Sequence, residues 1–199
     1  MNIVSKAGTE VCAARRSDAA ALADLIVIAG DGLPLVLWEQ MREGDETAMD
    51  VGRRRAKRDA GGFSWQKSDV VRDAEDLVIS ALVSYPLKQR TPAPDIAQAS
   101  AVFRPLLALE NLAVGTWYIN VLATFEHARG QGAATALLQH AETRARTSGY
   151  TALSLITGDV NPARKLYESL GFVEVAREEI VKSGWSYDGT EWLLYRKPV

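Results

Sequence analysis

Apolar and polar residues alternate along the chain in two periods, one typical of helices and one typical of strands. Over residues 19–29, Leu22, Leu25, Ile26 and Ile28 recur at near-helical spacing and predict an apolar helix face. Short apolar runs bounded by Gly, Pro, Asp or Ser predict strands instead. The pattern predicts helices over 19–29, 34–41, 95–109, 131–146 and 161–171. It predicts strands over 9–15, 63–73, 77–85, 118–124, 151–156, 172–181 and 190–197.

This mixed order favours an α/β fold with a twisted mixed sheet of six or seven strands, flanked by helices. No internal repeat, long linker or low-complexity segment interrupts it, so we expect one domain over residues 1–199. Residues 42–62 are polar and strongly basic around 53–58. A solvated helix face explains that run, and the alternative is a segment close to the substrate or to an anionic part of a cofactor.

Composition narrows the class of protein. Apolar residues make up 47% and the net charge is −2, so a strongly basic surface for nucleic acid or anionic lipid is not expected. A single cysteine and two histidines give no basis for a disulfide framework or a metal site. Residues 1–10 lack the apolar run of a signal peptide, and residues 19–37 are broken by charges and a proline. We therefore expect a cytoplasmic protein that does not bind membranes.

The segment with the most chemical information is a strand, a glycine turn and a helix between residues 118 and 138. The turn contains Gly130 and Gly132, and glycine lets a backbone approach a ligand closely. The first N–H groups of the following helix have no intrahelical acceptor, and the helix dipole favours an anion there. A diphosphate fits such a turn.

Two other nucleotide-binding motifs use a similar turn, and neither fits the sequence. A Walker loop needs Gly-Lys-Ser/Thr, whereas Gly132 is followed by Ala133 and Ala134. A dinucleotide fingerprint needs a third glycine, where this chain has Thr135, and an acid at the end of the next strand, where 151–156 has none.

The turn instead resembles the GNAT superfamily signature Arg/Gln-x-x-Gly-x-Gly/Ala, matched by Arg129, Gly132 and Ala134. The family usually has proline and an aromatic residue just before the arginine, and this chain has Glu-His-Ala at 126–128. That departure concerns the shape of the loop. The resemblance implies an acyl-CoA N-acyltransferase fold whose fourth strand, 118–124, pairs with the pantetheine arm of CoA.

A second block, Asn161 to Phe172, resembles the family pattern N-x-x-A-x-x-x-Y/F-x-x-x-G-F, with its alanine one position early. The resemblance makes Tyr167 the general acid that protonates the leaving thiolate of CoA. The simpler alternative is a tyrosine that packs in the core, and Asn161 needs no role beyond helix capping. The two blocks together imply an acetyl-CoA site formed by Leu122, Ala123, Thr124, Arg129, Gly130, Gln131, Gly132, Ala133, Ala134, Asn161, Arg164 and Tyr167.

An ammonium must lose a proton before it attacks, so a general base or a water relay is expected. The strands at 117–124 and 153–157 contain no acid. Three carboxylates lie near these strands, and Glu110 is the leading candidate, ahead of Glu75 and Glu126. A water held by Asn120 and Ser154 is a further candidate. The simpler expectation for each carboxylate is an exposed position at the surface.

The sequence leaves the amine acceptor open, as a small molecule or a protein. Aromatic residues with one carboxylate could frame a cationic amine, or could fill a core or a homodimer interface. These are Trp38, Glu39, Trp65, Tyr85, Trp185, Tyr187 and Trp192. Alternatives to acetyl transfer are a non-catalytic acyl-CoA sensor, a purely structural domain, and an enzyme for longer acyl or aminoacyl donors.

Overall fold

The computed structural model describes residues 10–199. Thr9, at the start of the first predicted strand, lies outside the described residues, as does nearly all of the 1–10 segment for which the sequence predicts no leader. The strands are β1 (Val11–Ala13), β2 (Ser68–Arg72), β3 (Val78–Pro86), β4 (Trp117–Thr124), β5 (Ala152–Gly158), β6 (Val173–Glu179) and β7 (Glu191–Pro198). The helices are α1 (Ala19–Ala29), α2 (Leu33–Glu39), α3 (Ala48–Ala56), α4 (Ala93–Gln98), α5 (Arg104–Leu112), α6 (Ala133–Thr147) and α7 (Arg164–Ser169), with 3-10 helices η1 (Arg16–Asp18), η2 (Trp65–Lys67), η3 (Ala101–Phe103) and η4 (Glu126–Ala128).

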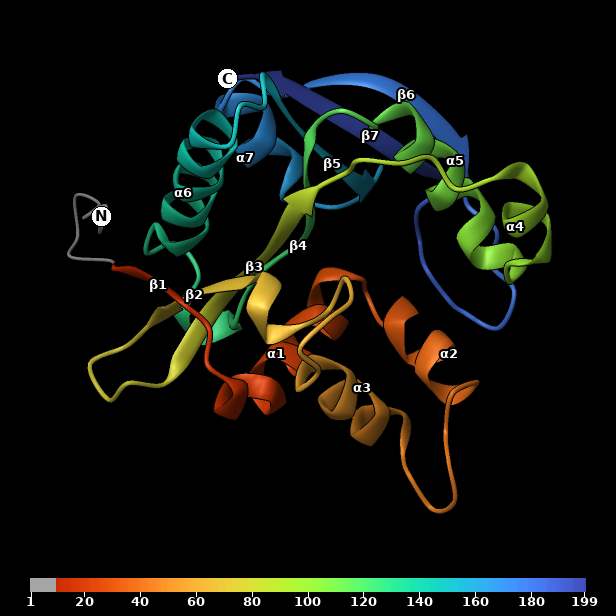
Figure 1. Ribbon diagram of the computed structural model, residues 1–199, viewed down its shortest axis with the longest axis horizontal. Coiled ribbons are helices and arrows are strands. Elements are labelled where there is room, and N and C mark those ends of the chain that lie inside the picture. The colour runs from red at the N-terminus through yellow and green to blue at the C-terminus, as the bar shows by residue number, and fades with distance from the viewer. Residues whose placement is uncertain (1–9) are drawn as a thin grey trace. The chain divides into compact units, whose positions relative to one another are not determined.

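The seven strands follow the order β1-β2-β3-β4-β5-β7-β6 in one sheet (Figure 1). β1 with β2 and β2 with β3 are antiparallel, β4 with β5 is parallel, and β7 is antiparallel to both β5 and β6. The sheet is therefore mixed, which confirms the predicted α/β class and strand number.

Contacts within the chain cluster into two compact units. The first unit runs up to Ser84 and includes Asn120–His140, and the second comprises Tyr85–Ile119 and Ala141–Val199. Strands β3 and β4 and helix α6 each continue from one unit into the other. The single domain expected over 1–199 stays a prediction.

In the first unit, α1 packs its apolar face into a core with β2 and β3. Leu22, Leu25 and Ile26 are buried, as the periodicity predicts. Ile28, which the pattern also places on that face, is 37% exposed because it lies at the edge of the apolar stripe, about 60° from Leu25 but about 120° from Leu22. Asp18, just before α1, forms a buried ion pair with Arg72 of β2 at 2.6 Å, which joins the helix start to the sheet.

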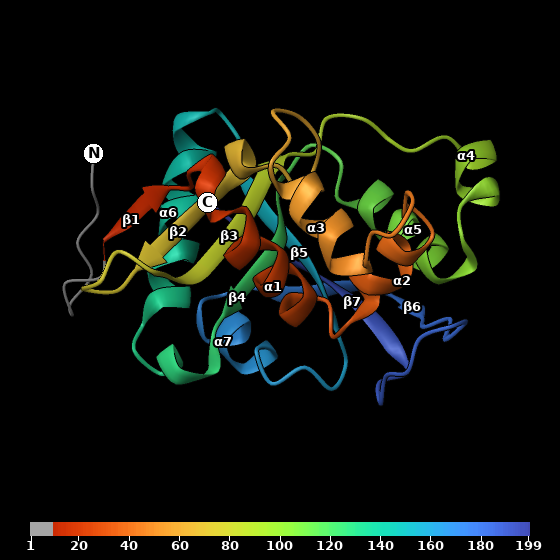
Figure 2. The same cartoon turned by 90° about the horizontal axis from the view of Figure 1, so that it is seen from below.

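Helices α2 and α3 pack closely against each other in the same unit (Figure 2). The ring of Trp38 on α2 is fully buried and lies over Gly52 of α3, where no side chain would fit. Thr47 and Asp50 form a capping box at the start of α3. The polar 42–62 segment therefore contains a real helix whose Arg53 and Arg54 are exposed, as a solvated face requires.

In the second unit, β5, β7 and β6 form a continuous antiparallel sheet, and α5 packs against all three (Figure 1). The sequence predicts one helix over 95–109, and this prediction is wrong in detail. The backbone becomes extended at Ala99, and the chain resumes through η3 into α5, with Pro105 in its first turn. Proline fits the first turn of a helix, where its missing N–H costs nothing, so it marks a start here.

Three predicted boundaries move for local reasons. The strand predicted over 63–73 begins only at Ser68, because Ser64 accepts a hydrogen bond from the Gln66 N–H and forms η2. The helix predicted from 131 begins at Ala133, after a positive φ at Gly132. The helix predicted from 161 begins at Arg164, after a turn closed by Asn161.

Candidate functional site

The predicted site residues fall into two groups, one in each unit. Residues 122–124 and 129–134 belong to the first unit, and Glu110, Asn161, Arg164 and Tyr167 belong to the second. Each group is described by itself. Among the described residues, no cluster of three or more His, Cys, Asp or Glu could hold a metal ion. No single helix within residues 10–199 is long and apolar enough to cross a membrane, although Arg16–Ala29 and Leu33–Glu39, bent by 119°, pass that test jointly.

The turn before α6 depends on glycine for its backbone conformation. Gly130 and Gly132 have φ values of +74° and +86°, which side chains other than glycine rarely adopt. A Cβ at either position would meet no atom within 4 Å. The space above the turn is therefore open, and the constraint on these two residues is conformational rather than steric.

The first backbone N–H groups of α6 project from this turn. The earliest hydrogen bond of the helix runs from the Ala136 N–H to the Gly132 carbonyl at 3.0 Å. The N–H groups of Ala133 and Ala134 precede it and have no intrahelical acceptor. The Arg129 side chain is exposed, and its Nε donates to the Thr124 carbonyl at 3.3 Å. Free amides, a helix dipole and an adjacent guanidinium together favour an anion such as a diphosphate.

Strand β4 pairs with β5 over only its first residues, Trp117 to Ile119. Leu122 and Thr124, beyond that register, are half-buried and alternate with buried Val121 and Ala123. The Ala123 carbonyl accepts a hydrogen bond from the Ser80 hydroxyl at 2.8 Å, so this carbonyl already has a partner. The Thr124 carbonyl also has a partner, because it accepts from Arg129, so Leu122 is the better candidate of the three residues predicted to pair with a ligand.

In the second unit, the residues around α7 have clear structural roles. The side-chain oxygen of Asn161 accepts from the Ala163 N–H at 2.9 Å and closes the turn before the helix, as its capping interpretation predicts. Arg164 donates to the Tyr195 hydroxyl at 3.1 Å and lies 3.7 Å from Glu168. These contacts hold α7 against β7.

Tyr167 is buried between Phe172 and Tyr195, with ring centroids 6.0 and 6.5 Å away. Burial raises the pKa of its phenol to about 12, so the group keeps its proton at neutral pH. Within residues 10–199 no group forms a hydrogen bond with the Tyr167 hydroxyl. A tyrosine that only packs in the core would be expected to have a hydrogen-bond partner for its hydroxyl. The Tyr167 hydroxyl has none among the described residues and remains available as a donor.

Glu110, from α5, differs from the other candidate carboxylates because it is half-buried. Burial raises the pKa of its carboxyl, and a hydrogen bond from Tyr118 of β4 lowers it in part. The Tyr118 ring lies 5.9 Å from that of Tyr85 on β3, in a T-shaped arrangement. A half-buried acid with a raised pKa is suited to taking a proton at neutral pH.

The remaining candidates lack this environment. Glu75 and Glu126 are exposed. Asn120 is half-buried, and the Ser154 hydroxyl lies 2.5 Å from that of Thr116 in a buried pair. Sequence reasoning assigned no role to Tyr118, because a strand tyrosine gives no signal until its partner from another element is known.

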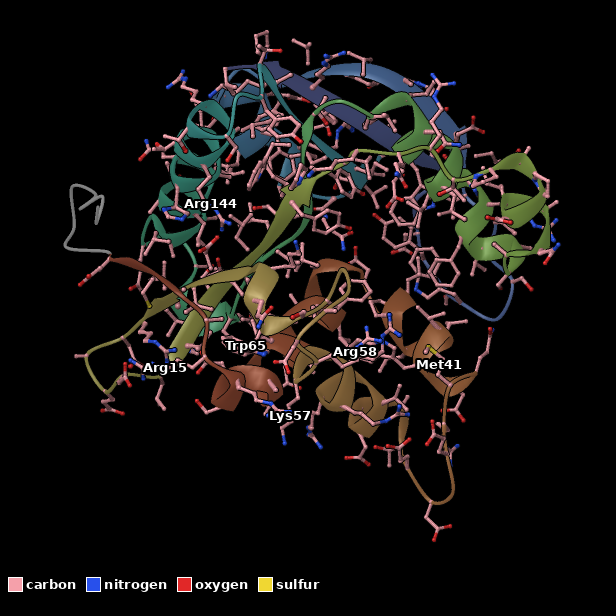
Figure 3. All side chains as sticks on the ribbon, in the orientation of Figure 1. Arg15, Met41, Lys57, Arg58, Trp65 and Arg144 are labelled. Atoms are coloured by element: carbon pink, nitrogen blue, oxygen red, sulfur yellow. The ribbon has the colours of Figure 1, made fainter. Side chains whose placement is uncertain are left out.

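The basic segment at the end of α3 contains none of the predicted site residues. It lines a hollow of about 500 Å³ with Arg16, Asp50, Arg53, Arg54, Lys57 and Arg58. Arg16 donates to the Lys57 carbonyl and Arg58 to the Arg55 carbonyl, so both cations satisfy groups at the C-terminal end of α3. Figure 3 labels Lys57 and Arg58 at this end of the helix. Helix capping accounts for Arg16 and Arg58, while Arg53 pairs with Asp50 and Arg54 with Glu46.

The aromatic residues predicted to surround an acceptor have different surroundings in the fold. Trp38 is in the core of the first unit. Trp185, Tyr187 and Trp192 form a nearly parallel stack in the second unit, with centroids 4.8–5.9 Å apart. Figure 3 also labels Arg144, whose guanidinium lies over the Trp117 ring at 5.2 Å. Three of these rings, those of Trp185, Tyr187 and Trp192, are thus occupied by stacking within the chain.

The sequence from 46 to 172 matches the acetyltransferase (GNAT) family. This match includes the glycine turn, Glu110 and the whole of α7. No curated protein matches the chain.

Solved structures with a similar fold cover nearly the whole chain. A histone acetyltransferase HPA2 and related acetyltransferase from Corynebacterium glutamicum ATCC 13032 is 26% identical over 96% of each chain, with a TM-score of 0.58. Mosquito arylalkylamine N-acetyltransferase like 5b is 15% identical over 95% of this chain and 99% of its own, with a TM-score of 0.67. Drosophila melanogaster polyamine N-acetyltransferase is 13% identical over 95% and 99%, with a TM-score of 0.65.

Proposed function

Since the chain belongs to the acetyltransferase (GNAT) family, we propose that it transfers the acetyl group of acetyl-CoA directly to a primary amine. Membership of the family makes it an N-acetyltransferase, and the proposal concerns the donor, the acceptor and the residues. The observation that supports it most is the glycine turn that leaves free amides at the start of α6. That turn lies where the family signature occurs.

In this proposal the donor is bound mainly through its diphosphate. The amides of Gly130, Gln131, Gly132, Ala133 and Ala134 donate to the phosphate oxygens, and the helix dipole adds to the attraction. Arg129 supplies a positive charge beside the turn. The backbone of β4 at residues 122–124 pairs with the amide groups of pantetheine, chiefly through Leu122, because Ser80 and Arg129 occupy the carbonyls of Ala123 and Thr124. Asn161 and Arg164 stabilise the segment that precedes Tyr167 and stay candidates for contact with the donor.

The reaction proceeds without a covalent enzyme intermediate. Glu110 accepts a proton from the acceptor's ammonium, and the neutral nitrogen attacks the thioester carbonyl carbon. The new C–N bond forms, the C–S bond breaks, and sulfur leaves with the bonding electrons. Tyr167 donates its proton to this thiolate, and the nitrogen loses a second proton that restores the phenol. The products are an amide, free CoA and one proton released from Glu110.

Tyr167 suits this role because burial keeps its phenol protonated at neutral pH, so it holds a proton that it can donate to the leaving sulfur. Its hydroxyl has no competing partner among the described residues. A thiolate formed beside it would be protonated as it leaves, and general acid catalysis of this kind contributes roughly 10²–10⁴-fold to a rate.

The direct test measures CoA thiol released from acetyl-CoA by the purified protein, with and without a panel of primary amines. We expect release that depends on the amine and equals the amount of N-acetylated product. Tyr167→Phe should lower kcat by at least about 10²-fold and leave CoA affinity nearly unchanged.

Three results would count against the proposal. CoA binding without amine-dependent release would indicate a sensor, and absence of CoA binding would indicate a structural domain. Faster turnover of a longer acyl-CoA would replace the acetyl donor. The acceptor's identity, a homodimer and a cytoplasmic location stay predictions from sequence.

A further inference from the structure

Glu110 is a half-buried carboxylate with no cation beside it among the described residues. Two other shielded carboxylates each have one: Asp18 pairs with Arg72 at 2.6 Å, and Glu142 pairs with Lys197 at 2.5 Å. Within residues 10–199, no lysine, arginine or histidine forms an ion pair with Glu110. Removing a carboxylate from water is unfavourable unless a cation or several donors compensate it.

Two phenols face this carboxylate from two other elements. Tyr118 of β4 is buried, with 3% of its surface exposed. Tyr85 of β3 is half-buried, like Glu110 itself. Their rings lie 5.9 Å apart at 70°. Burial, and next the charge of Glu110, raise the pKa of both phenols, so both remain neutral. Glu110 and Tyr85 are partly exposed to the solvent, whereas Tyr118 is buried.

The neighbouring elements add no charge to this cluster. Helix α5 packs against α4, η3, β5, β6 and β7, and none of them contributes a charged group that alters the pKa of Glu110. Among the described residues, Tyr118 is the one side chain that lowers the pKa of Glu110, and the titratable groups that interact with Glu110 are the two tyrosines. The cluster therefore has negative charge and aromatic surface, and lacks a positive charge.

We propose that Glu110, Tyr118 and Tyr85 form the binding site for the ammonium group of the acceptor, a small primary alkylamine that is charged at neutral pH. The inference rests on the proposed function and names its acceptor class. Glu110 pairs with the ammonium, and the Tyr85 ring adds a cation–π contact. Tyr118 is a positioning residue: its hydroxyl holds the carboxylate in place and favours its ionised form.

This arrangement prepares the proton transfer. An ammonium beside Glu110 favours the carboxylate, so binding lowers the pKa of Glu110 from its raised value. The carboxylate then takes one proton from the bound nitrogen and leaves it neutral. Neutral alcohols of the same shape have no charge to offer and should bind far more weakly.

The test follows the Glu110 carboxyl by ¹³C NMR titration of the full chain without CoA, with Glu110→Gln to assign the signal. We expect a midpoint above that of an ordinary glutamate. Saturating n-butylammonium should lower it by about 1 pH unit, and n-butanol should leave it unchanged.

Three variants separate the roles of the two phenols. Tyr118→Phe removes the donor, so the midpoint should rise by about half a pH unit or more. Tyr85→Phe is the matched control, because it loses a hydroxyl that does not contact Glu110, and its midpoint should equal that of the wild type. Tyr85→Leu removes the ring and should weaken the response to n-butylammonium several-fold.

Unchanged titration of Glu110 in the presence of n-butylammonium, or in Tyr118→Phe, would overturn this inference. The measurement needs no turnover, so it is independent of the proposed function. If the protein transfers acetyl groups to amines but n-butylammonium does not change the titration of Glu110, the inference fails and the function stands. If Glu110 responds and the protein has no affinity for CoA, the function fails and the cation site stands.

Discussion

Glu110 illustrates how one residue's burial changes its chemistry. On sequence alone it was one of several carboxylates near the predicted site, and an exposed position was the simplest expectation for each. In the fold, Glu75 and Glu126 are exposed while Glu110 is enclosed with two tyrosines. Sequence gives a residue's type and its element, but the fractional burial that sets its pKa depends on segments distant in the chain.

The raised pKa of Glu110 predicts a pH-dependent stability. The folded chain holds this proton more tightly than the unfolded chain, so the group stabilises the fold fully below its ordinary pKa. Its contribution is lost as pH rises through the folded-state pKa. Glu110→Gln removes this dependence. We expect the Tm of the variant to match the wild type near pH 4 or below and to exceed it by a few degrees at pH 8, by calorimetry. A difference in Tm that stays constant with pH would show that Glu110 is not perturbed by burial.

At the scale of elements, sequence predicts best where the periodicity and the terminator agree. The helix over 19–29 is found with the predicted bounds, and β4 differs from its predicted range by one residue. The helix predicted over 95–109 is interrupted, because periodicity does not register the extended backbone at Ala99. The glycine turn was predictable because positive φ values restrict residue type locally. The Glu110 cluster was not, because Tyr85, Glu110 and Tyr118 come from three elements.

The packing of α2 on α3 gives a prediction at this scale. Replacing glycine by alanine inside a helix ordinarily stabilises it by roughly 0.5–1 kcal/mol. At Gly52 a Cβ would lie 2.3 Å from the buried Trp38 ring, so the rings and helices must move apart. We expect Gly52→Ala to lower the free energy of unfolding by about 1–3 kcal/mol in urea denaturation. A stabilised variant would mean that α2 and α3 do not pack as described.

At the scale of the whole molecule, the proposed roles are distributed over both compact units. The first unit contains the turn proposed to bind the diphosphate, and the second contains the tyrosine and glutamate proposed to move protons. The two family motifs were recognisable because each is contiguous in sequence. Their chemistry still depends on coenzyme A binding at the turn, which is the claim on which the donor, the reaction and the acceptor class rest.

Calorimetric titration with CoA tests that claim most directly, using Gly132→Ala and a control at the other end of α6. Gly149 has a φ of +79° against +86° for Gly132, and a Cβ meets nothing within 4 Å at either residue. Both variants should therefore lose about 1–2 kcal/mol of backbone stability. We expect Gly132→Ala to weaken CoA binding by about tenfold or more, because relieving the strain turns the amides away from the diphosphate. Gly149→Ala should bind CoA like the wild type. Equal CoA affinity in the two folded variants, or no CoA binding by the wild type, would contradict the account.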